Sequence, residues 1–478
     1  MEEELSVDTI KSRAIKGIAT LTGRTFVLQA IAFGATFLLT IFLDPSQYGT
    51  FFLVSAVINF FTYFSDIGLA AALIQKKETP SQEELRTTFT VQQLLILFLV
   101  ALILILLPLI RSWYNFDDSA MLLMMAITLS LFLSSLKTIP SVLLERKLDF
   151  NRLVIPQIVE TILFYSVAVY LAWKGFGITS FTVAVLVRGI SGLVMMYLLS
   201  PWMPGIDFSR EHLKKLLKYG LPYQANTFLA VFKDDGMTAI LGSIIGPSGI
   251  GLLGWAQKWA SAPLRFFMDQ VIKVTFPGYS RLQNNITELS KAVNQSIFVI
   301  CLFVFPALLG LIVLAPALTE IIPKYSKWQP ALLALSLISI NTIFAAFTTP
   351  LTNLLNAVGK IKVTFRLMIM WTVLTWIFVP ILALNFGING AALGYALVGV
   401  SSVVAVFVAT RYVKFDLMFA VGKPLIAAVV MAAIIYQVQT FLPLNFVSIL
   451  FLISVGVLVY SVAIILLVGI KTFKALRP

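Results

Sequence analysis

Long apolar runs dominate this chain and limit what it can fold into. Runs of about 20 mostly apolar residues follow one another, and each is long enough to cross a bilayer as a helix. Backbone groups inside lipid must be hydrogen-bonded internally, which an α-helix achieves within one segment. We therefore predict an all-α integral membrane protein with about 14 transmembrane helices. The predicted spans lie near residues 19–43, 50–74, 88–110, 119–143, 153–173, 178–200, 220–245, 250–272, 294–316, 329–354, 365–385, 388–410, 421–441 and 446–470.

Composition supports this class and leaves one open question. The chain is 59% hydrophobic and 12% charged, whereas an ordinary soluble domain carries about a quarter charged residues. A soluble globular protein is thus excluded. The formal net charge is +13, and such an excess suits nucleic acid, a membrane surface or an anionic substrate.

The positions of the basic residues decide between these partners. If the N-terminus is inside, the inner segments hold 25 lysines and arginines, and the outer connections hold four, namely Arg111, Lys174, Lys324 and Lys327. Basic residues near helix ends stay on the cytoplasmic side of a membrane. The asymmetry predicts a multi-pass membrane protein with both termini cytoplasmic. It also accounts for nearly all of the net charge, so no nucleic-acid partner is expected.

Several kinds of chemistry are excluded by residue counts. The chain has one cysteine, Cys301, and one histidine, His212, so disulfide frameworks, zinc sites and Cys/His nucleophile pairs are not expected. Cys301 lies in an apolar run and is interpreted as a core residue. His212 lies in the charged segment 210–215 and is interpreted as solvated. No phosphate-binding GxxxxGK[ST] loop occurs. We expect no catalytic residues, no metal and no cofactor.

Two short motifs recur and suggest an internal duplication. Pro45-Ser46-Gln47-Tyr48-Gly49 matches Pro247-Ser248-Gly249-Ile250-Gly251 at an offset of 202 residues, and Phe176-Gly177-Ile178 matches Phe386-Gly387-Ile388 at an offset of 210. A repeat of six spans enters the membrane in the same orientation twice, which is a transporter architecture. We predict six-helix bundles at residues 1–200 and 201–412, followed by two additional helices at 413–478.

Charged residues inside the spans concentrate in the matching hairpins of the two halves. Such residues are costly in lipid and are expected to face a cavity or a partner. Lys258, Arg265 and Asp269 share one helical face of the eighth span. The predicted substrate-binding residues, which would line a cationic cleft for an amphiphile with an anionic head, are Lys258, Arg265, Arg24, Lys233, Asn59 and Tyr63. The alternative is that these charges form buried pairs, such as Arg265 with Asp269.

Four acidic residues are candidates for coupling transport to an ion gradient, because a protonated or ion-bound carboxyl crosses the membrane field more cheaply. They are Asp66, Asp235, Asp234 and Glu160. The alternative is that Asp66, Asp235 and Glu160 balance Arg24, Lys233 and Arg188. Trp255, Trp259, Tyr63 and Tyr223 offer flat surfaces for sugar rings or lipid chains, or are packing residues.

Several motifs resemble one family over nearly the whole chain. They are Phe42-Leu43-Asp44-Pro45-Ser46-Gln47-Tyr48-Gly49, Asp66-Ile67-Gly68-Leu69, Ala72-Leu73-Ile74-Gln75, and Glu145-Arg146-Lys147-Leu148-Asp149-Phe150, together with Asp235, Gly246-Pro247 and Gly251. In these the sequence resembles the Wzx-type polysaccharide flippases of the multidrug/oligosaccharidyl-lipid/polysaccharide (MOP) exporter superfamily. The motif at 145–150 resembles the colanic-acid type.

The resemblance implies a MATE-like V-shaped pair of six-helix bundles with alternating access. It implies that an undecaprenyl-pyrophosphate-linked oligosaccharide repeat moves from the inner to the outer leaflet of the bacterial inner membrane, driven by an ion gradient and held by a cationic cavity. The expected partners are this polyprenyl-linked oligosaccharide, membrane lipids and the polysaccharide polymerase machinery. Two alternatives stay open: a membrane-embedded polysaccharide polymerase or ligase, and a drug or peptidoglycan-precursor exporter on the same scaffold.

Overall fold

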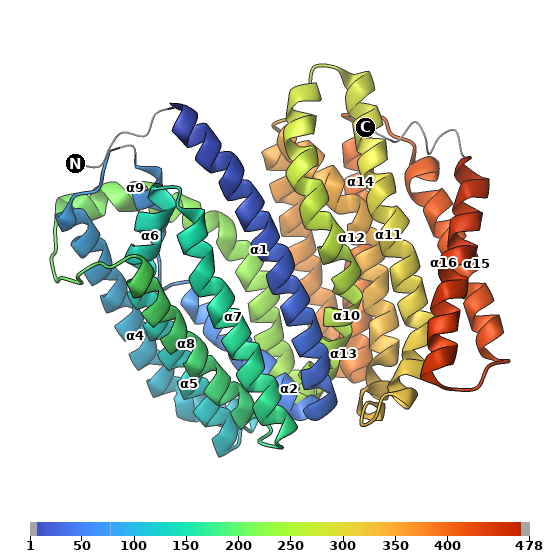
Figure 1. The fold of residues 1–478 in the computed structure, drawn as a ribbon, viewed down its shortest axis with the longest axis horizontal. Helices are drawn as coiled ribbons and strands as arrows, with labels where there is room; N and C mark the ends of the chain where they lie inside the picture. Colours follow the sequence, from blue (N-terminus) through green and yellow to red (C-terminus); the bar gives the residue numbers. More distant parts are fainter. Residues whose placement is uncertain (1–6, 77, 470–478) are drawn as a thin grey trace. The chain divides into compact units, whose positions relative to one another are not determined.

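A computed structural model describes residues 7–76 and 78–469, without the side chains of residues 7–22, 219, 221–227, 230, 269, 270, 273 and 274. Every regular element in this described part is helical (Figure 1), which confirms the all-α prediction. Residue contacts divide the chain into two compact units, residues 1–248 and 249–478, and each is described by itself.

The N-terminal unit contains nine complete α-helices, one π-helical turn and the start of a further helix. They are α1 (Val7–Phe42), α2 (Pro45–Thr62), α3 (Leu69–Gln75), α4 (Gln82–Tyr114), α5 (Asp118–Leu136), α6 (Thr138–Arg146), α7 (Phe150–Trp173), α8 (Thr179–Leu199), α9 (Arg210–Val231), η1 (Phe232–Gly236) and the first residues of α10 (Met237–Leu282). Within it α7 contacts both α1 and α8, and α5 also packs on α8.

The C-terminal unit begins inside α10. It continues with α11 (Ile286–Ile321), η2 (Ser326–Ala331), α12 (Leu332–Ala357), α13 (Ile361–Ser401), α14 (Val403–Thr410), η3 (Met418–Gly422), α15 (Lys423–Gln439) and α16 (Phe446–Val468). Its core gathers along α11, where Phe298, Cys301 and Phe305 are fully buried. The interpretation of Cys301 as a core residue is confirmed. The last two predicted spans correspond to α15 and α16, which pack on α11.

Eleven helical segments of the described chain are long and apolar enough to cross a membrane. Two of them, Phe232–Met268 and Ile361–Thr410, each contain a glycine outside the helical region of backbone space. Gly246 has φ 68° and ψ 175°, and Gly387 has φ 58° and ψ −135°. Positive φ at low cost is a property of glycine. The predicted span at 50–74 is divided between α2 and α3, and neither helix is among the eleven.

The turn between α1 and α2 shows why its motif has this sequence. Asp44 precedes α2 as its cap, Pro45 occupies the first turn, and the Asp44 backbone N–H donates to the Gln47 side chain at 3.1 Å. The same Gln47 lies against Gly177, where a Cβ would approach its amide nitrogen to 2.8 Å. Gly177 itself has φ 57°. The two repeated motifs of the first half therefore pack on each other in one corner of the N-terminal unit.

The motif at 145–150 has a structural function. The Arg146 guanidinium donates to the carbonyl oxygens of Leu73 at 2.5 Å, Lys76 at 2.7 Å and Glu78 at 2.8 Å, all at or beyond the end of α3. Carbonyls at a helix C-terminus lack partners inside the helix. Arg146 thus satisfies them and joins α6 to α3. Asp149 then caps α7 by accepting from the Arg152 backbone N–H at 3.2 Å.

Candidate functional site

Asn59, on α2, and Tyr63, directly after it, are predicted to contact substrate and lie against the end of α9 and the π-helical turn η1. The Asn59 side chain is hydrogen-bonded to the Asp235 carboxylate, and the Tyr63 ring lies 5.4 Å from the Phe228 ring between centroids. A π-helical turn redirects the side chains it carries and is frequent at functional sites. Asn59, Tyr63 and Asp235 are therefore brought together inside the N-terminal unit.

The three charged residues of η1 have different partners. Lys233 Nζ lies 2.5 Å from Asp234 Oδ1, and Asp235 has Asn59 as its partner. Consecutive helical residues point in different directions, so one carboxylate meets the cation and the next does not. The alternative in which Lys233 balances Asp235 is wrong, because its partner is Asp234. Asp235 is thereby left half-buried with an amide partner and with no cation partner among the described side chains.

Asp66 lies in the turn between α2 and α3. Its Oδ1 accepts from the backbone N–H of Leu69 at 2.9 Å and of Ala70 at 3.4 Å. These bonds satisfy donors at the start of α3, next to Gly68, which has φ 81°. The alternative that Asp66 balances Arg24 is wrong, because the contacts of Asp66 are with the α3 backbone.

Glu160, a predicted coupling residue, is buried on α7 between two cations. It pairs with Lys137, at the junction of α5 and α6, and its Oε2 lies 3.8 Å from Arg188 Nε on α8. A Cβ at Gly192 of α8 would collide with the carboxylate, so glycine leaves the room that Glu160 occupies. The alternative that Glu160 balances Arg188 is confirmed, with Lys137 as an additional partner. The paired carboxylate thus links three helices, because removing one partner would leave an uncompensated buried charge.

Arg24 of α1 points to the same side of α7. Its Nη1 donates to the Gln157 side chain, and Nη2 lies 3.4 Å from the Thr25 hydroxyl. Its buried Nε has no hydrogen-bond partner among the described residues. A hollow of about 290 Å³ lies beside Arg24 and Arg188 and is lined by α1, α7 and α8. Arg24 is therefore grouped with Arg188 and Gln157, which the sequence analysis had not selected as substrate contacts.

Lys258 and Arg265 lie on α10 within the C-terminal unit. Lys258 is half-buried and Arg265 is exposed, and the two cations repel each other. Neither forms an ion pair with any described carboxylate. The predicted alternative partner, the Asp269 side chain, lies outside the described residues. Unlike Lys137, which is paired with Glu160, these two cations are available to an anionic ligand within the described part of the unit.

Trp255, one of the aromatic residues of α10, is a packing residue. Trp255 is 3% exposed, its indole Nε1 donates to the Tyr325 hydroxyl at 3.0 Å, and its ring stacks on Trp328 at 5.6 Å. The interpretation that Trp255 offers a flat surface to a sugar is wrong, because its ring is buried and packs against the rings of Tyr325 and Trp328. The Tyr223 side chain lies outside the described residues.

The interpretation of His212 as solvated is also wrong. Its Nδ1 lies 3.4 Å from Glu84 Oε1 and its Nε2 3.6 Å from Glu83 Oε2, with 25% of its side chain exposed. Glu84 also binds Lys76 at 2.7 Å. His212 therefore lies against the acidic start of α4, far from it in the sequence.

Residues missed in the sequence analysis are mainly Lys137, Gln157 and Arg188. Arg188 was named above only as a counter-ion for Glu160, and nothing in the linear sequence joins Lys137 to Glu160. A usable signal existed: a buried carboxylate in a span requires a cation nearby. Choosing among the available cations needs the packing of α5, α7 and α8.

Comparison with known proteins gives concordant results. A family model described as polysaccharide biosynthesis protein matches residues 38–333. The chain is 23% identical over 407 residues to the lipopolysaccharide biosynthesis protein WzxC of Escherichia coli (strain K12), covering 82% of this chain and 79% of the relative. It is 24% identical over 404 residues to the succinoglycan biosynthesis transport protein ExoT of Rhizobium meliloti (strain 1021), covering 82% and 80%.

Solved structures share the fold. The lipid II flippase MurJ in an inward closed conformation has a TM-score of 0.76 at 18% identity and covers 93% of this chain and 98% of its own. An inward-facing multidrug resistance MATE family transporter of the MOP superfamily has a TM-score of 0.63 at 17% identity and covers 83% and 98%. At these identities the likeness concerns the architecture, which is that of membrane transporters.

Proposed function

This chain belongs to the polysaccharide biosynthesis protein family, and from that premise we propose that it is a flippase for a lipid-linked oligosaccharide. It would carry a polyprenyl-pyrophosphate-linked repeat unit from the inner to the outer leaflet of the bacterial inner membrane by alternating access. The main support is that relatives named for polysaccharide biosynthesis and transport match about four fifths of the chain. The fold, which is shared with a lipid II flippase, agrees with it. The protein would act as a transporter and not as an enzyme.

A membrane polymerase or ligase is disfavoured by the connections between helices. Such an enzyme would be expected to carry a long outer loop with catalytic residues. The longest connection between described helices is residues 200–209, which the predicted topology places on the inner side. An exporter of drugs or peptidoglycan precursors on the same scaffold remains the alternative that fits the fold.

The proposed topology has fourteen spans with both termini cytoplasmic. Gly246 and Gly387 each divide a continuous segment into two spans, and α2 with α3 forms one more beyond the eleven. Gly177 and Gly387 have nearly the same φ, 57° and 58°, at matching places in the predicted repeat. This likeness supports two six-helix bundles, residues 1–200 and 201–412, with 413–478 as an addition.

The proposed substrate contacts are Lys258, Arg265, Arg24, Lys233, Asn59 and Tyr63. Lys258 and Arg265 are the strongest, because no described carboxylate neutralises them, and a guanidinium and an ammonium suit a pyrophosphate. Lys233 is the weakest, since Asp234 already pairs with it. Polymerase machinery that uses the delivered repeat is the proposed partner.

Among the coupling candidates Asp235 is best placed. It is half-buried and has no cation partner among the described residues. By contrast, Lys137 neutralises Glu160, Lys233 neutralises Asp234, and Asp66 already accepts hydrogen bonds from N–H groups at the start of α3. A carboxylate that is not neutralised can take up a proton or a sodium ion. We therefore propose Asp235, hydrogen-bonded to Asn59, as the coupling residue.

The decisive experiment follows the lipid-linked repeat across the membrane. Loss of the protein should make lipid-linked repeats accumulate on the cytoplasmic leaflet, detected by whether an added periplasmic glycosidase reaches them. Lys258→Glu and Arg265→Glu should give the same accumulation while the protein remains inserted at normal levels. Unpolymerised repeats on the outer leaflet would contradict the flippase assignment and favour a polymerase.

A further inference from the structure

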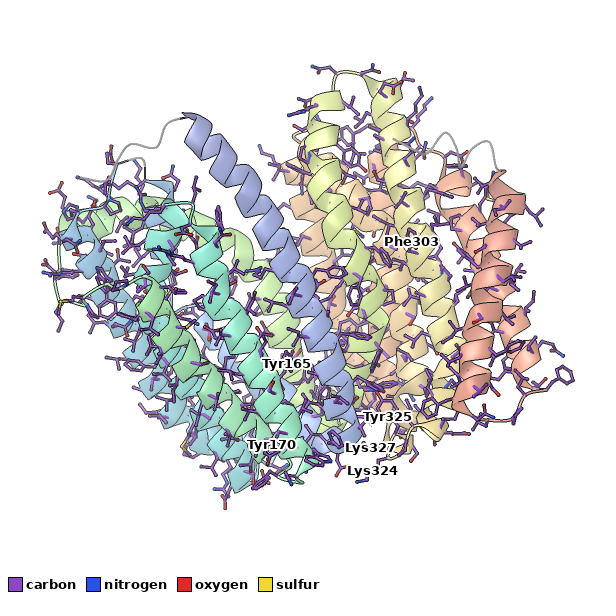
Figure 2. All side chains as sticks on the ribbon, in the orientation of Figure 1. Tyr165, Tyr170, Phe303, Lys324, Tyr325 and Lys327 are labelled. Atoms are coloured by element: carbon purple, nitrogen blue, oxygen red, sulfur yellow. The ribbon has the colours of Figure 1, made fainter. Side chains whose placement is uncertain are left out.

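Two adjoining hollows follow the contact between α1 and α7 in the N-terminal unit. The first, the cationic pocket, has a volume of about 290 Å³, and Arg24, Gln29 and Arg188 are among its lining residues. The second, the apolar furrow, has a volume of about 690 Å³ and is lined by side chains of α1 from Ile31 to Phe42 and of α7 from Ile162 to Trp173. Tyr165 lines both, and Figure 2 shows Tyr165 and Tyr170 following each other along α7.

We propose that these hollows form one site for the lipid part of the transported molecule. The cationic pocket takes the phosphate attached to the lipid, and the apolar furrow takes the first portion of its hydrocarbon chain. The inference rests on the proposed flippase function and adds to it a binding place for the chain on α1 and α7.

The charges of the cationic pocket favour a phosphate. Two guanidinium groups line it, and the carboxylate nearest to Arg188, that of Glu160, is already paired with Lys137. Arg188 keeps 54% of its side chain exposed, and the buried Arg24 Nε lacks a hydrogen-bond partner among the described residues. Guanidinium groups bind phosphate oxygens through paired hydrogen bonds. An anion in this pocket would accept hydrogen bonds from guanidinium N–H groups that lack an acceptor among the described residues.

The shape and lining of the furrow favour a hydrocarbon chain. Small residues, Ala35 on α1 and Ser166 on α7, leave it open, while Leu38, Ile162 and Trp173 are 40%, 42% and 60% exposed. From Ile31 to Phe42 a helix rises about 16 Å, roughly half of a hydrocarbon core of about 30 Å. The furrow therefore has the length of a chain that crosses about one leaflet. The Tyr165 hydroxyl is hydrogen-bonded to Thr36, which ties α7 to α1 at the junction of the two hollows.

The depth of the pocket favours a transported lipid over a resident phospholipid. Arg24 lies inside the predicted span 19–43, and Arg188 lies near the middle of the predicted span 178–200. A glycerophospholipid keeps its phosphate at the membrane interface, where water solvates it. A phosphate at the depth of Arg188 belongs to a lipid whose head group is crossing the membrane.

The test uses the full-length protein in lipid nanodiscs and a polyprenyl phosphate that carries a photoreactive diazirine in an isoprene unit near the phosphate. After illumination, the labelled peptides are identified by mass spectrometry. Label should concentrate on residues 31–42 and 162–173. A phosphatidylglycerol with a diazirine in its acyl chain serves as the second arm and should label these segments no more than the other lipid-facing helices.

Two variants make the result specific. Ala35→Trp fills the furrow and should remove the label from both segments, whereas Ile105→Trp, at a 74% exposed position of α4, should leave it unchanged. Arg188→Gln should weaken binding of the polyprenyl phosphate about tenfold, the usual effect of losing a charge-assisted hydrogen bond. Each variant is first checked for a normal elution profile and melting temperature.

The outcomes separate this inference from the proposed function. Label on other helices, or label that persists in Ala35→Trp, overturns the furrow assignment even if transport of lipid-linked repeats continues. Stronger labelling by phosphatidylglycerol in both segments overturns it in favour of a resident phospholipid. Absence of transport by the unmodified protein, with the furrow labelled as expected, contradicts the flippase function and leaves the lipid site standing.

Discussion

The cations within the spans of the two units have different surroundings. In the N-terminal unit Lys137 and Arg188 converge on Glu160, and the carboxylate is buried between helices α7 and α8. In the C-terminal unit Lys258 and Arg265 lie near each other on α10 without a described carboxylate. Lysine and arginine side chains are therefore paired with a carboxylate in one unit, whereas in the other they have no carboxylate partner among the described side chains. A charged residue within a span is a candidate for a structural or a functional role. The partners of its side chain decide which of the two roles is favoured.

The largest expected effect comes from breaking the N-terminal cluster. Glu160→Leu leaves Lys137 without its counter-ion in a buried place, and this should cost about 3 to 5 kcal/mol of unfolding free energy. Thermal unfolding of the purified protein, followed by circular dichroism, measures the loss. The double variant Lys137→Met with Glu160→Leu should recover most of it. An unchanged melting temperature in Glu160→Leu would contradict the structural function of this pair.

A smaller effect should follow from changing the space that Glu160 occupies. In Gly192→Ala the added methyl group collides with the carboxylate and must displace it from Lys137. Overpacking of this kind costs about 1 to 3 kcal/mol. The matched control is Gly23→Ala, where a Cβ meets nothing within 4 Å. Equal melting temperatures for the two variants would show that α7 and α8 adjust freely at this point.

The smallest effect on stability is expected in the C-terminal unit. Lys258→Gln removes a half-buried cation that has no described counter-ion, so unfolding should change by no more than about 0.5 kcal/mol. Export of surface polysaccharide should nevertheless fall strongly, because the proposed pyrophosphate contact is lost. The comparison between the units fails if Lys258→Gln destabilises the protein as much as Glu160→Leu does.

Local motifs predicted local structure well. The turn motif at 42–49 contains its own capping residues, Asp44 and Gln47, and glycine at 246 and 387 marks the two places where long helical segments depart from helical geometry. These features depend on neighbours in the chain, so they can be read directly. The motif at 145–150 carried part of the family resemblance, but its structural role could not be predicted from the sequence. Arg146 binds carbonyl oxygens at the end of α3, and these lie about 70 residues earlier in the chain.

The sequence by itself determined that this is a helical membrane protein, where its helices lie approximately, and which few charges lie within them. Hydrophobicity and helical periodicity act over short distances, and the cost of a charge in lipid depends mainly on its depth. Tertiary structure alone decided which charges are paired. Glu160 meets Lys137 and Arg188, Asp66 meets the backbone of α3, and Lys258 meets no described carboxylate, because ion pairs depend on distances between helices that packing sets.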